Sequence, residues 1–459
     1  MQCPVFRGIG GVAHKYYLLF QHHLAPPVST YTTDAEQTTH ANAQGTSGRD
    51  AVQLKDAWVN TEVATDPCYI IGKSPGPYVE ERSRSIYCQL GARMAFLGID
   101  ARTERTRHQI NYPETYKQIF SRVSHELAAA NGSIKHLILL LGVPIAYPRL
   151  QWLENIFQSP VIGPLRFLNK RFGFAGGFFN HFDGQVDLLD DLDDHYTAHQ
   201  HKKERKGLIL QLQNLAREHS VRVTILGGDV HLAALGRFYS NPKQNIPATA
   251  DWRFMTNVIS SAITNKPPPT AVANLLARRN KIHHLDTETD ETLLNLFDVD
   301  PAHDRGDVKN KTQDKNHCTM PSRNFAVITE SRDHEARARM TNGDGVAVNG
   351  GDPTNGVNGH ATNGVNGAAN HTAPPTSTGK NFTPSSNPRS ALHEGESNAG
   401  AAHPASSGLE HTGLGGPDGL DVTIRVEIDQ YDPEGRTRGY GLSIPGLDCR
   451  GFRGQGKTW

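Results

Sequence analysis

The chain has 459 residues, of which 37% are hydrophobic, and it carries 47 Lys and Arg against 47 Asp and Glu. This balance gives no overall field that would draw the protein to nucleic acid or to an anionic membrane. Five cysteines lie far apart without a Cys-x-x-Cys pair, so neither a disulfide framework nor a zinc knuckle is indicated. We expect a soluble, cytoplasmic protein without a transmembrane segment, because the most apolar run, 137–143, is too short to span a bilayer.

Strands and helices alternate over the first half of the sequence. Residues 93–100 predict a strand, and a helix with one apolar face begins at Pro113. A second strand over 136–143 is followed by predicted helices over 148–157 and 198–219, and the next strand begins at Val221. Such alternation indicates an α/β layered fold, in which the carboxyl ends of the strands carry the chemistry.

The segment from Gln151 to Phe174 mixes large apolar side chains with Arg and Lys. Two interpretations fit it: an ordinary helix packed on the sheet, or an insertion that contacts a membrane surface or covers the site. A peripheral membrane contact is therefore left open.

Residues 332–417 differ in composition from the rest of the chain, because Gly, Asn, Thr, Ser, His and Pro dominate. Ordering each residue costs about 1–2 kcal/mol, and this stretch has almost no apolar surface to bury in return. The hexapeptide TNGVNG occurs at 354–359 and again at 362–367, a low-complexity repeat. We expect a long disordered insertion.

Alternating apolar residues return after the insertion. Val422, Ile424 and Val426 alternate with polar residues, a turn follows at 432–435, and a return strand is predicted near 440–444. An isolated hairpin is marginal in water, so this one is expected to complete the domain beside 324–329. The predicted organisation is a main domain over 3–331, the insertion over 332–417, the hairpin over 418–447 and a tail over 448–459. The tail matches a phosphate-loop pattern at 451–458, but too few residues follow to form the helix that such a loop requires.

The strand that begins at Val221 ends in Gly227-Gly228-Asp229-Val230-His231. The two glycines allow a sharp turn and a close approach of the backbone, and Asp and His together are metal ligands. The alternative is that Asp229 caps a following helix and His231 is structural.

The run from Asp190 to His231, with Asp193-Asp194-His195-Tyr196, Glu204-Arg205 and the Gly-Gly-Asp-Val-His motif in this order, resembles the C-terminal half of PhoD-like phosphatases of the metallophosphoesterase superfamily. The runs 6–11 and 97–102 and the strand before Val143-Pro144 are similar to a fungal-type branch of that family. The resemblance covers about 3–329 and resumes at 420–445.

This resemblance implies a partial four-layer α/β/β/α sandwich that hydrolyses phosphoric esters with metal ions at its strand ends. A phosphorylated substrate and divalent or trivalent metal ions, such as iron, calcium, zinc or manganese, are thereby implied. A bound cation lowers the pKa of its water to about 7 and offsets charge that builds up on phosphate oxygens.

The resemblance also assigns roles to individual residues. Asp229 and His231 match the last metal-ligand motif of the family. Asp194, His195 and Tyr196 match a catalytic segment at the mouth of the pocket, although an acidic, solvated loop is the other interpretation. Arg102 has the planar fork that binds phosphate oxygens, or else it forms an ordinary ion pair with Asp100 or Glu104.

The early motifs of the superfamily, an Asp-x-His, a Gly-Asp and a Gly-Asn-His, belong ahead of the stretch that opens this sequence and are not found. We therefore expect an incomplete set of metal ligands and no appreciable phosphatase activity from the chain as written. Two hypotheses follow: part of a metal-dependent phosphatase, or a non-catalytic binding or scaffold module that keeps the fold.

Overall fold

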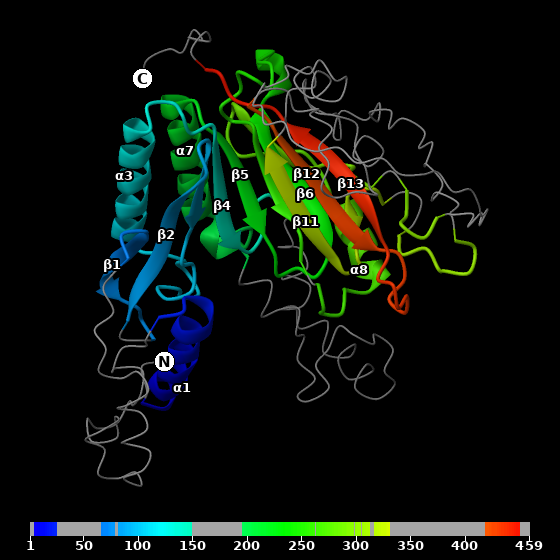
Figure 1. Cartoon of the computed structure of the whole chain (residues 1–459), viewed down its shortest axis with the longest axis horizontal. Coiled ribbons are helices and arrows are strands. Elements are labelled where there is room, and N and C mark those ends of the chain that lie inside the picture. The colour runs from blue at the N-terminus through cyan, green and yellow to red at the C-terminus, as the bar shows by residue number, and fades with distance from the viewer. Residues whose placement is uncertain are drawn as a thin grey trace, which may run out of the picture.

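The computed structural model describes residues 4–24, 66–78, 81–148, 195–261, 263–297, 299–303, 305–312, 316–330 and 418–449. A large mixed sheet, sheet A, carries helices on one face and a smaller sheet, sheet B, on the other (Figure 1). The fold is therefore a mixed α/β sandwich, as the sequence predicts. The described residues build three layers, and the fourth layer stays a prediction.

Sheet A has ten strands. They are β1 (Tyr69–Pro75), β2 (Arg82–Leu90), β3 (Met94–Gly98), β4 (His136–Gly142), β5 (Arg222–Gly227), β6 (Ala233–Ser240), β7 (Met255–Ile259), β8 (His283–His284), β9 (Thr289–Leu293) and β10 (Thr319–Met320). Their order is β1-β2-β3-β4-β5-β7-β6-β9-β8, with β10 beside β6. The four central strands β3, β4, β5 and β7 run parallel, and both flanks are antiparallel.

The helical segments are α1 (Pro4–Gln21), α3 (Pro113–Ala129), η6 (His199–His201), α7 (Lys202–His219), η7 (Pro242–Gln244) and α8 (Thr270–Arg278). Helix α3 begins with Pro113 in its first turn and buries Tyr116, Ile119, Val123 and Leu127, which recur at helical spacing. Helices α3 and α7 contact each other and cover one face of sheet A (Figure 1). Their positions match the helices that the sequence predicts from 113 and over 198–219.

Sheet B consists of β11 (Asn324–Glu330), β12 (Leu420–Glu427) and β13 (Thr437–Ile444). The hairpin predicted from alternating residues is confirmed: β12 pairs antiparallel with β13 and, on its other side, with β11. Val422, Ile424 and Val426 are buried in the core shared with the opposing face of sheet A. The predicted insertion over 332–417, the helix over 148–157 beyond Pro148 and the segment 151–174 lie outside the described residues, so the domain boundaries stay predictions.

Arg222 joins the two sheets at the amino end of β5. Its side chain is fully buried and donates to the carbonyl oxygens of Pro445 and Gly446 after β13, at 3.0 and 3.2 Å. It also donates to the carbonyls of Ala248, Asp251 and Phe254. A buried cation is tolerated only where its donors are satisfied, so these bonds fix the C-terminal hairpin on sheet A.

A second contact holds the ends of β11 and β12 together. Arg93 forms ion pairs with Glu330 at 2.9 Å and Asp418 at 2.5 Å. The buried His136 bonds to the backbone carbonyl of Asp418 at 2.6 Å through Nε2. Burial lowers the pKa of His136 to about 4, so its imidazole is neutral at physiological pH.

Candidate functional site

The carboxyl ends of the four parallel strands meet at one edge of sheet A, because β3, β4, β5 and β7 are neighbours in register. The segments that follow them are Asp100–Arg102 after β3, Val143–Tyr147 after β4, Gly227–His231 at the end of β5 and Ser260–Ser261 after β7. This is the edge at which open α/β sheets bind ligands. Every described residue for which the sequence predicts a role lies in or near these segments.

Asp229 and His231 occupy the strained part of this edge. Both have left-handed backbones, with φ of 73° and 53°, a conformation that costs a non-glycine residue about 1–2 kcal/mol. Asp229 is exposed and His231 half-buried. The backbone N–H of His231 donates to Ser261 Oγ at 3.1 Å, and Asn265 Nδ2 lies 3.4 Å from His231 Nε2. Backbone strain at an exposed Asp and a half-buried His favours a functional role over a helix cap.

Asn324, the first residue of β11, holds the end of β7 in place. Its Oδ1 accepts from Ser260 Oγ at 2.9 Å and from the backbone N–H of Ser261 at 3.2 Å. Its Nδ2 donates to the carbonyl of Ser261 at 2.8 Å. Since Ser261 in turn bonds to His231, sheet B positions the candidate ligand through two buried hydrogen-bonding residues.

The glycine pair brings β5 against the loop that follows β4. A Cβ at Gly227 would lie 3.0 Å from Cα and 3.1 Å from N of Pro144. The backbone N–H of Gly228 donates to the carbonyl of Gly142 at 2.8 Å. The close backbone approach predicted for these glycines is therefore present.

Two buried polar residues hold the loop Val143–Tyr147 from either side. Asn257 Oδ1 accepts from the backbone N–H groups of Ile145 and Ala146, both at 3.0 Å. Arg205 donates to the carbonyl of Ile145 at 2.9 and 2.7 Å and forms a buried ion pair with Glu291. The sequence prediction missed Asn257, although a lone amide inside the apolar run MTNVI is a signal of such a role.

His195 and Tyr196 are buried where α7 and the loop after β4 meet. The ring of His195 stacks on Tyr147 with 6.0 Å between centroids and a 7° angle between planes. Burial raises the pKa of Tyr196 far above its ordinary value, against the opposing effect of Arg105 and Arg102, so its phenol stays protonated. Asp194 lies outside the described residues. The catalytic role assigned to this segment stays a prediction.

Arg102 follows β3 and is exposed. The carboxylate of Asp100 accepts bonds from the backbone N–H groups of Arg84, Arg102 and Thr103 and from the hydroxyl of Thr103. The buried Glu104 accepts from Ser83, Thr115 and the backbone N–H of Tyr112. Both carboxylates thus serve the local turn, and the phosphate-binding role of Arg102 stays a prediction.

Asp229 and His231 supply one hard oxygen and one nitrogen, a donor set that suits iron, zinc or manganese. Within the described ranges, no group of three or more His, Cys, Asp or Glu side chains is arranged to hold a metal ion. Within those ranges, the two residues supply only part of the ligand set that a metal centre needs.

The fold is an α/β sandwich with Asp-x-His after a glycine-terminated strand. The chain belongs to the family of PhoD related phosphatases, whose family model matches residues 84–164 and 165–349, more than half of the chain. A curated relative, "Uncharacterized protein YGR266W" of Saccharomyces cerevisiae, is 40% identical over 347 residues. The match covers 72% of this chain and 44% of the relative, so the chain spans less than half of the length of that protein. No solved structure matches.

Over the residues that the structure describes, no helix combines the length and the apolar character needed to cross a membrane.

Proposed function

We propose that the chain supplies Asp229 and His231 to a metal centre that hydrolyses phosphoric esters. The observation that carries this proposal is the left-handed backbone of both residues at the end of the central parallel strand. Membership of a phosphatase family that is generally metal-dependent supports it. Iron, zinc, manganese and calcium are the metals proposed.

The chain's own residues account for part of the chemistry. The carboxylate of Asp229 and the imidazole of His231 would hold the metal, and the Ser261–Asn324 bonds keep the His231 backbone in place. When bound, the metal would supply an activated water and offset negative charge on the phosphate. Arg102, exposed beyond β3, would pair with phosphate oxygens.

Metal content tests the ligand assignment directly. We expect Asp229→Asn and His231→Gln each to lower the metal bound by the purified chain after loading with iron, zinc, manganese or calcium, measured by elemental analysis. Asp307→Asn is the matched control, because Asp307 is a solvent-exposed aspartate paired with Arg305. Unchanged metal stoichiometry in both ligand variants would show that these residues do not bind metal.

A non-catalytic scaffold is the second candidate, since the described residues supply only two of the ligands that a metal pair needs. We expect the chain to have no appreciable activity on aryl phosphate monoesters and diesters by itself. Metal-dependent turnover that Asp229→Asn abolishes would exclude the scaffold. Metal binding without turnover, even in a longer protein of the family that contains these residues, would favour it.

A further inference from the structure

Helix α1 carries an apolar stripe that faces solvent. Ile9, Val12, Tyr16 and Phe20 recur at helical spacing and are 62, 50, 49 and 65% exposed. They are four of the nine large hydrophobic residues that are exposed among the described residues. Isolated exposed hydrophobics are ordinary, whereas a contiguous stripe on one helix marks an interaction surface.

The opposite side of α1 is buried. His14 and Leu18 are buried, and His22, just beyond the helix, bonds to the hydroxyl of Tyr69 at 3.3 Å. This contact places the C-terminal end of α1 beside the first residue of β1 (Figure 1). The helix thus has one buried side, with His14 and Leu18, and one exposed apolar side.

The charge of α1 favours an anionic partner. The helix contains Arg7 and Lys15 and no acidic residue. The ammonium of Lys15 lies 5.7 Å from the centre of the Tyr16 ring. A basic residue beside an exposed aromatic stripe is typical of helices that lie in a membrane interface, with the apolar face in the acyl boundary and the cation at the headgroups.

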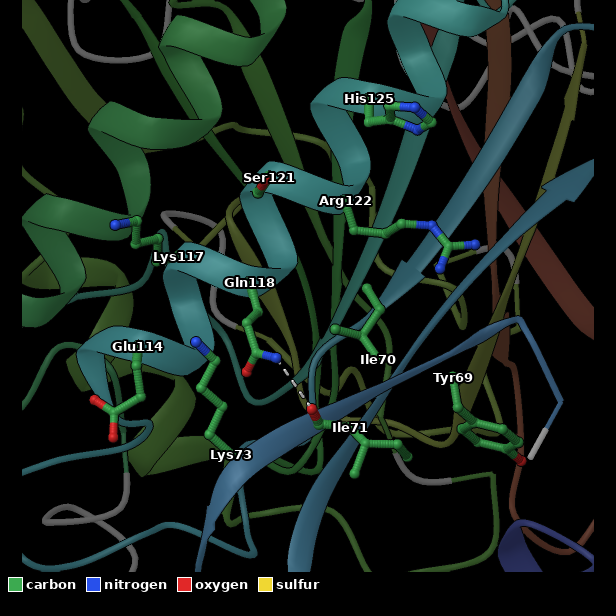
Figure 2. Close-up of a pocket in the computed structure, with 10 residues that line it drawn as sticks. All are labelled: Tyr69, Ile70, Ile71, Lys73, Glu114, Lys117, Gln118, Ser121, Arg122 and His125. Atoms are coloured by element: carbon green, nitrogen blue, oxygen red, sulfur yellow. Dashed lines mark hydrogen bonds between the residues drawn. The ribbon is translucent and has the colours of Figure 1, made fainter. Parts of the chain in front are cut away.

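A basic groove of about 640 Å³ opens beside this helix, between β1 and α3. Lys73, Lys117, Arg122 and His125 line it, with Glu114 as the acidic residue in the lining. Figure 2 shows Lys73 reaching from β1 towards α3, while Tyr69, at the other end of the groove, lies next to α1. Both lysines are exposed, and Arg122 also pairs with Glu126 at 2.7 Å. The groove therefore ends at Tyr69, which contacts His22 just beyond the C-terminal end of α1.

We propose that α1 and the basic groove form a docking surface for an anionic phospholipid membrane. The stripe of α1 inserts among the acyl chains, and the lysines of the groove bind headgroup phosphates. The whole chain carries 47 basic and 47 acidic residues, so no global charge draws it to the membrane and the attraction must come from a local basic surface. The proposal is independent of the metal site.

Vesicle flotation of the full chain tests this surface. We expect the protein to float with vesicles of phosphatidylcholine and phosphatidylserine at low salt, and to stay unbound with phosphatidylcholine alone. Phe20→Glu should weaken binding about tenfold or more, because it replaces a large apolar side chain, which inserts into the membrane in this proposal, by a carboxylate. Tyr431→Glu is the matched control, since Tyr431 is an aromatic residue that is 82% exposed elsewhere.

The groove is tested in the same assay. Lys73→Glu and Lys117→Glu should each weaken binding about fivefold or more, whereas Lys243→Glu, at an exposed lysine of η7, should not. All these positions are exposed, so circular dichroism should show an unchanged fold. Inorganic phosphate that binds the groove without any vesicle binding would assign the site to free phosphate and overturn the proposal.

Three further results would overturn it. One is absence of flotation with the anionic vesicles at low salt. Another is flotation that Phe20→Glu leaves intact, which would assign the contact to another region such as 151–174. The third is concentration-dependent dimerisation that Phe20→Glu abolishes in the absence of lipid, which would assign the stripe to a second copy of the chain.

Discussion

The ion pair between Arg205 and Glu291 offers a quantitative test of how the loop after β4 is held. The two side chains are 4 and 2% exposed, and Arg205 also donates twice to the carbonyl of Ile145. Glu291→Leu leaves the Arg205 charge buried without its partner, which costs about 3–5 kcal/mol of unfolding free energy. Arg205→Met removes the ion-pair partner of the buried Glu291 carboxylate and should lower the unfolding free energy by a similar amount. The double variant buries neither of these two charges and should lose only about 1–3 kcal/mol, because the Ile145 carbonyl loses the donors of Arg205.

Urea denaturation followed by circular dichroism measures these differences, provided that the slope with denaturant stays constant. Arg305→Met is a control, because its pair with the exposed Asp307 should be worth less than about 1 kcal/mol. The double variant is expected to be more stable than either single variant. Losses that simply add would show that the two charges are not coupled, and the account of this loop would be refuted.

Three other predictions concern stability. The contribution of His136 to the unfolding free energy should be constant above pH 6.5 and fall by about 3 kcal/mol towards pH 4, because unfolded His136 binds a proton near 6.5 whereas burial lowers its folded pKa to about 4. A pH titration of His136→Gln should lack this part of the fall. Gly236→Ala should lower the Tm, because its Cβ would meet the carbonyl oxygen of Ala146, whereas Gly306→Ala has open space and should not. Replacing 332–417 by a short turn should leave the Tm nearly unchanged, because Glu330 and Leu420 are direct partners in register; a large fall would show that the segment packs against the domain.

Three of the four parallel strands of sheet A could be predicted because they are apolar and the helices between them are periodic, whereas β7 was not predicted. The predicted strand over 93–100 is β3, that over 136–143 is β4, and the helix from Pro113 is α3. The antiparallel flanks escaped prediction, and in two of their strands, β2 and β9, polar residues occupy several buried positions. In β2, the fully buried Ser83 bonds to Glu104, and the fully buried Ser85 bonds to the backbone N–H of Asp100. Strand β9 buries Asp290 and Glu291.

The candidate site likewise combines residues that a local sequence pattern reveals with residues that no local pattern reveals. Asp229 and His231 follow a glycine pair on an apolar strand, which is a local signal in the sequence. Asn257 and Asn324 act across the fold, on residues 112 and 63 positions away. A local sequence pattern cannot predict these contacts, because only the order of the strands in the fold brings each asparagine close to the residues that it bonds.

The split of sheet B across the chain has a consequence for synthesis on the ribosome. Strand β11 ends at Glu330, and its partner β12 begins at Leu420. At about 5–20 residues per second, roughly 4–17 s pass before that partner is made. During this interval the face of sheet A that includes Ile138, Leu235 and Val258 lacks the side chains that bury it in the finished protein. We therefore expect the nascent chain to depend on chaperones until the last strands emerge and Arg222 can bind Pro445.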